Sequence, residues 1–60
     1  MLHFIHNDWH GWQGSNAFLL SDESQKQLHS FENADMAITW LWMQGNKDAA
    51  RALNAAKKKA

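Results

Sequence analysis

The clearest hydrophobic pattern lies in the C-terminal half of the chain. Residues 36–43 (MAITWLWM) are apolar except for Thr39, and small apolar residues then recur at helical spacing, at Ala49, Ala52, Leu53 and Ala56. An apolar stripe that repeats every three to four residues is typical of a helix with one buried face. The pattern therefore predicts helices at 34–44 and 47–58.

The residues between and before these two segments favour the same boundaries. Asn33 can cap the first helix, and Gly45 can take the left-handed conformation that ends it. Asn46 can then cap the second helix. Because the link is so short, we expect the two helices to form an antiparallel hairpin.

The middle of the chain shows a weaker pattern. Ser21 followed by Asp22 and Glu23 is typical of a helix N-terminus, so we expect a third helix at 22–30 with Leu28 turned inward. Residues 17–20 (AFLL) either form a buried extended segment or continue this helix backward.

The N-terminal segment, residues 1–16, has two readings. Residues 1–5 can pair as a strand with 17–20, or the whole segment can lie as an irregular arm over the helical hairpin. Gly11 and Gly14 break any helix there. We favour the arm, because an isolated pair of strands is only marginally stable.

Composition supports a helical protein. The chain has no Val, Tyr or Pro, and its β-branched residues are Ile5, Ile38 and Thr39 alone, whereas helix-forming residues are abundant. We therefore expect an all-α fold of three short helices in a single domain, with 1–16 as arm and 17–60 as helical part.

The length of 60 residues sets a limit on stability. A chain of this size buries only about 60 % of its unfolded surface and commonly needs reinforcement. The absence of Cys excludes disulfides and thiol nucleophiles. No apolar run approaches the about 18 residues of a membrane span, and no signal peptide is recognisable. We expect a complete, cytoplasmic protein with no membrane partner.

Charge is balanced overall but uneven along the chain. Residues 1–44 carry a net charge of −4 and residues 45–60 a net charge of +4. The basic segment suggests phosphate contacts from Lys47, Arg51, Lys57, Lys58 and Lys59. A helix-turn-helix motif would need a small residue at Leu41 and an apolar one at Arg51, and a neutral chain is atypical of nucleic-acid binding. Nucleic-acid regulation is therefore the alternative function.

Three N-terminal histidines raise the question of a metal site. His6 and His10 would share a face if this segment were helical, and the chain starts with an amine-X-His arrangement ending at His3. Structural zinc usually needs four ligands at defined spacing, so we expect ordinary imidazoles, with no metal and no cofactor. No nucleophile, carboxylate pair or phosphate-binding loop predicts an enzyme.

Two closely spaced tryptophans indicate a binding surface. Trp40 and Trp42 lie two positions apart, so on a helix their rings point in different directions and one small core can hardly cover both. We expect a non-enzymatic, regulatory protein that binds a protein partner or forms a homo-oligomer, as a homodimer or as a subunit of a larger complex. The expected binding residues are Trp40, Leu41, Trp42 and Met43.

Overall fold

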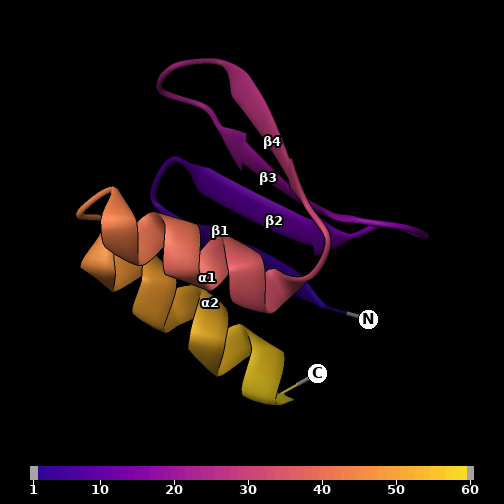
Figure 1. Ribbon diagram of the computed structural model, residues 1–60. Helices are drawn as coiled ribbons and strands as arrows, with labels where there is room; N and C mark the ends of the chain where they lie inside the picture. Colours follow the sequence, from indigo (N-terminus) through magenta and orange to yellow (C-terminus); the bar gives the residue numbers. More distant parts are fainter. Residues whose placement is uncertain (1, 60) are drawn as a thin grey trace.

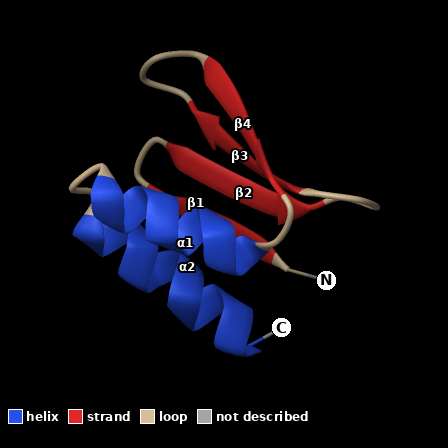
Figure 2. Cartoon of the chain, viewed as in Figure 1, coloured by secondary structure: helices blue, strands red, loops and turns tan. Residues whose placement is uncertain are grey.

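Four antiparallel strands precede two helices in the computed structural model, which describes residues 2–59 (Figure 1). The strands follow one another in the sheet in chain order, β1-β2-β3-β4. Their bounds are His3–His6 for β1, Trp9–Gln13 for β2, Phe18–Asp22 for β3 and Gln27–Phe31 for β4. Helices α1 (Ala34–Met43) and α2 (Lys47–Lys59) lie side by side over one face of this sheet (Figure 2).

The protein is thus an α+β fold, and the expectation of an all-α fold with three helices is wrong. The expected helix at 22–30 is instead the end of β3, a turn and most of β4. The expected arm at 1–16 contains β1 and β2, which pair with each other. The alternative pairing of 1–5 with 17–20 is wrong too, because β2 lies between those two segments.

Short strands with apolar residues on both faces explain this error. Phe4 and Ile5 are adjacent in β1, as are Leu19 and Leu20 in β3, so neither strand shows an alternation of apolar and polar residues. Phe4 and Leu20 are buried, whereas Ile5 is exposed. Gly11, which suggested a break, lies inside β2.

The helical hairpin was predicted correctly. Asn33 caps α1 by accepting a hydrogen bond from the backbone N–H of Met36 at 3.0 Å. Gly45 has a φ of +85° in the link after α1, and the carbonyl of Asn46 accepts the N–H of Ala50 at 3.0 Å as α2 begins. Among residues 2–59, neither helix has the length and apolarity needed to cross a membrane.

Asp22 has a different role from the one expected at a helix start. Its carboxylate accepts hydrogen bonds from the hydroxyl of Ser24 at 2.7 Å, from the N–H of Ser24 at 3.0 Å and from the N–H of Gln25 at 3.4 Å. These bonds fix the turn between β3 and β4, which ends at Lys26 with a φ of +54°. The Ser-Asp-Glu sequence therefore closes a hairpin, because Asp side chains stabilise turns as well as helix ends.

The core lies between the sheet and the two helices. The sheet contributes three large buried side chains, Phe4, Phe18 and Leu20. They pack against a helical surface of small residues and two leucines, namely Ala34, Ala37, Leu41, Ala49, Ala50 and Leu53. Alanines let the helices approach closely, so that α2 packs against β1 while α1 packs against β3 and β4. One face of the sheet is thereby covered.

Candidate functional site

Within residues 2–59, no helix covers the opposite face of the sheet. Side chains alternate between the two faces of a strand, so the register places two rows of residues on the side away from the helices. One row runs across all four strands as His3, Trp12, Leu19 and Ser30, and the other as Ile5, His10, Ser21 and Leu28. We call these eight residues the outer sheet face.

This outer sheet face combines exposed apolar side chains with an absence of charge. Ile5 is 67 % exposed and Leu28 60 % exposed, although both are large aliphatic residues. Trp12 and Leu19 lie between them and are half-buried. None of the eight residues is Asp, Glu, Lys or Arg. A solvated face of an antiparallel sheet usually carries polar residues, so the exposure of Ile5 and Leu28 makes this face a candidate for binding.

Three rings form a cluster on the outer sheet face. The Nε2 atoms of His3 and His10 are 2.8 Å apart, and their rings meet edge to face with centroids 4.7 Å apart. The ring centroid of Trp12 lies 5.3 Å from the ring centroid of His10. The β1–β2 register brings these side chains together although they are separated by up to nine positions in the sequence.

A second aromatic cluster lies on the helix side of the sheet. Trp40 of α1 contacts the rings of Trp9, His29 and Phe31, with centroids 5.9, 4.6 and 5.7 Å from its own. All four residues are half-buried, and this cluster extends the core toward one end of the molecule. It fixes α1 against β2 and β4.

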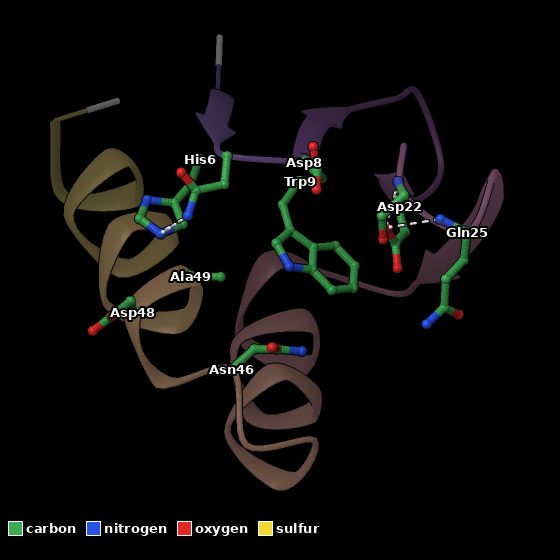
Figure 3. Close-up of a pocket in the computed structure, with 10 residues that line it drawn as sticks. His6, Asp8, Trp9, Asp22, Gln25, Asn46, Asp48 and Ala49 are labelled. Atoms are coloured by element: carbon green, nitrogen blue, oxygen red, sulfur yellow. Dashed lines mark hydrogen bonds between the residues drawn. The ribbon is translucent and has the colours of Figure 1, made fainter.

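A polar cleft lies at the end of the molecule where three turns meet (Figure 3). These are the β1–β2 turn, the β3–β4 turn and the link between the helices. The cleft has a volume of about 390 Å³ and is lined by His6, Asn7, Asp8, Trp9, Asp22, Ser24, Gln25, Asn46, Asp48 and Ala49. Among residues 2–59, no Lys or Arg lines the cleft, so a phosphate group would meet no basic side chain of this part of the chain there.

Asp22 is the buried charged group of this cleft, with 5 % of its surface exposed. The hydroxyl of Ser24, helped by the N–H groups of Gln25 and Ser24 and by the nearby His29, holds the pKa of the Asp22 carboxyl below its usual value and outweighs burial, which raises it. The carboxylate is therefore ionised at neutral pH and committed to the turn. It has the wrong protonation behaviour for a general acid or base near pH 7.

The four residues expected to bind a partner are divided by the structure. Leu41 is fully buried in the core, and Trp40 belongs to the second aromatic cluster. Trp42 is 42 % exposed and Met43 is 79 % exposed. The guanidinium of Arg51 lies 5.7 Å from the centroid of the Trp42 ring and covers part of it. The two indoles thus diverge, and Trp42 and Met43 stay exposed on α1 together with Met36, which is 49 % exposed.

The basic residues expected to contact nucleic acid are spread along α2. Nη1 of Arg51 lies 3.8 Å from Oδ1 of Asp48, and Lys57 forms an ion pair with Asp35 of α1. The other three basic residues, Lys47, Lys58 and Lys59, are exposed. Lys47 begins the 13-residue helix and the other two end it, so the two groups are about 16 Å apart by helical rise. The structure therefore does not gather the five residues into one patch.

The histidines are also arranged differently from the helical expectation. His6 pairs with Trp9 and faces the cleft, whereas His10 faces the opposite side of the sheet, so these two do not share a face. His3 is the neighbour of His10. Within residues 2–59, no group of three or more His, Asp or Glu side chains is arranged to hold a metal ion.

Comparison of the chain with family models, with curated proteins and with solved structures gives no match. The geometry of this molecule is therefore the basis for its proposed function. Sequence reasoning missed the outer sheet face because its residues come from four separate segments. The available signal was the pair of adjacent apolar residues in each of 4–5 and 19–20, which is typical of strands with apolar side chains on both faces.

Proposed function

We propose that this is a non-enzymatic protein that self-associates through the outer sheet face, with a second copy of the chain as its partner. The observation that carries the proposal is the exposure of Ile5 and Leu28 on a face without any formal charge. The binding role expected from the sequence is kept, but its surface moves from α1 to the sheet.

The absence of charge favours a second copy as the occupant. In a two-fold symmetric interface the same surface of both subunits is in contact. A surface with charges of one sign would therefore repel its copy. The outer sheet face has no such charge, and its serines and histidines can donate and accept hydrogen bonds across an interface. A strongly charged partner would find no complementary group there.

The dimensions of the sheet also favour a second sheet. Four strands about 4.8 Å apart give a width of roughly 19 Å, whereas a helix is about 10 Å across and would cover only half of it. Two sheets pack face to face about 10 Å apart with their side chains interdigitated. Such an interface is small, below about 800 Å² per partner, so we expect a weak dimer that forms at high concentration.

The test introduces one charge into each of two exposed apolar surfaces. Leu28→Glu places a carboxylate on the outer sheet face, and Met43→Glu places one on α1, where the residue is even more exposed. Sedimentation equilibrium over a wide range of concentrations should show a dimer for the parent chain and for Met43→Glu. Leu28→Glu should weaken dimerisation by about tenfold or more, a cost of about 1.4 kcal/mol.

The opposite result, in which Met43→Glu dissociates the dimer and Leu28→Glu does not, would place the interface on α1 and overturn the proposal. A parent chain that stays monomeric at millimolar concentration would overturn it as well. Salt provides a further control, because association through apolar surface should persist when the salt concentration rises, whereas phosphate binding by the α2 lysines would weaken steeply.

A further inference from the structure

We propose that His3 and His10 form a chelating pair for a divalent transition-metal ion on the outer sheet face. This inference does not require self-association, since a single chain supplies both imidazoles. The ligand is a metal ion, whereas the partner proposed above for this face is a second protein chain. The observation that carries it is the approach of two Nε2 atoms to 2.8 Å on neighbouring strands.

The sheet holds the two imidazoles at nearly the separation that a metal requires. Zinc–nitrogen bonds are about 2.0–2.1 Å long, so two nitrogens at a tetrahedral centre lie roughly 3.3 Å apart. The rings must therefore separate by about half an ångström and turn so that both nitrogens point at one ion. His3 is exposed and His10 is half-buried beside the ring of Trp12, so His3 has the greater freedom to make this rotation.

The backbone reduces the entropy that chelation would otherwise cost. His3 pairs with Trp12 and His10 pairs with Ile5, so the two histidines are diagonal neighbours in one hairpin. Both side chains therefore point to the same side before any ion binds, and their positions are set by the β1–β2 ladder. Preorganisation of this kind raises affinity because fewer rotatable bonds must be fixed on binding.

The chemistry of the donors selects the class of ion. Imidazole nitrogen suits Zn²⁺, Cu²⁺ and Ni²⁺, whereas Mg²⁺ and Ca²⁺ prefer oxygen. The outer sheet face offers no carboxylate to these hard cations. Two protein ligands leave the remaining coordination positions to water, so we expect modest affinity and ready exchange of the ion.

The experiment uses Zn²⁺ as the probe. It compares variants of the two histidines of the proposed pair with variants of the other two histidines, which serve as controls. Calorimetric titration at pH 7, at concentrations where the chain is monomeric, should show one Zn²⁺ ion per chain. His3→Ala and His10→Ala should each weaken Zn²⁺ binding by about tenfold or more, since one imidazole is lost from the pair. His6→Ala and His29→Ala remove imidazoles on the helix side of the sheet and should leave the affinity unchanged.

Nuclear magnetic resonance of the imidazole nitrogens gives a readout that does not depend on affinity. Addition of Zn²⁺ should shift the Nε2 signals of His3 and His10 and leave those of His6 and His29 in place. Unchanged Zn²⁺ affinity in His10→Ala would overturn the proposal, because it would place the ion away from the His3–His10 pair. Loss of binding in His6→Ala would overturn it equally.

Discussion

At the scale of single residues, Gly11 shows how closely the sheet packs. It lies in the middle of β2, between Phe4 and Leu20 on the neighbouring strands. A Cβ at this position would lie 2.7 Å from Cζ of Phe18 and 3.1 Å from a ring carbon of Phe4. Both rings are buried, so they fill the space above the glycine. The residue that looked like a break in the sequence is therefore required by the core.

We predict that Gly11→Ala destabilises the protein by about 1–3 kcal/mol, the usual cost of adding a methyl group to a filled core. Urea unfolding monitored by circular dichroism measures this cost. The matched variant adds Phe18→Leu, which shortens the side chain that the new methyl would meet. The double variant should lose less stability than the sum of the two single variants. A stability of Gly11→Ala within about 0.5 kcal/mol of the parent would contradict this prediction.

Asp22 gives a prediction about pH. Because its pKa in the folded protein is lower than in the unfolded chain, its contribution to stability is fully present above the unfolded value of about 3.9. That contribution is lost as the pH falls through the lower folded pKa. Asp22→Asn cannot ionise, so we expect it to be less stable than the parent at pH 7 and to approach the parent's stability below about pH 4.

Thermal melting of both proteins between pH 7 and pH 2 checks this expectation. Glu23→Gln is the matched control, since Glu23 is exposed beside the same turn. The melting temperature of Glu23→Gln should differ little from that of the parent at every pH. A gap between Asp22→Asn and the parent that stays constant down to pH 2 would show that the ionised carboxylate contributes nothing, contrary to the prediction.

At the scale of elements, the two helices were predictable and the four strands were not. Helix boundaries were marked by local signals, namely Asn33 at one end and Gly45 at the other, and these act within a few residues of the chain. Strands of four or five residues depend on pairing with neighbours, which local sequence does not specify. The Asn7–Asp8 turn also lacked the Asn-Gly sequence that most clearly predicts a hairpin, although Asn7 has a φ of +51°.

The link between α1 and α2 offers a test at this scale. Gly45 has a φ of +85°, but a Cβ there would have no atom within 4 Å, so any cost of substitution comes from backbone conformation alone. We predict that Gly45→Ala destabilises the protein by about 1 kcal/mol. Gly45→Asn should cost less, because Asn tolerates the left-handed region better than Ala. Equal stability of all three chains in urea would contradict this account.

At the scale of the whole molecule, the surroundings of Trp40 and Trp42 could be predicted only in part. Helix geometry alone predicts that the rings of Trp40 and Trp42 diverge, and in the structure they do. Helix geometry does not predict the sheet, which supplies a layer large enough to cover Trp40 and to bury Leu41. The same sheet has a second face, and a face assembled from four separate segments leaves little trace in the order of residues.

The packing of α2 against β1 has a consequence for synthesis in the cell. Each strand pairs with the one made just before it, and the helices form their own hairpin, so nearly all partners meet soon after they are made. Phe4 waits longest for its cover, because α2, which packs against β1, is made after all four strands and after α1. The first hairpin therefore exposes a phenylalanine to water until α2 has been made, and during this interval the nascent chain is most prone to aggregation.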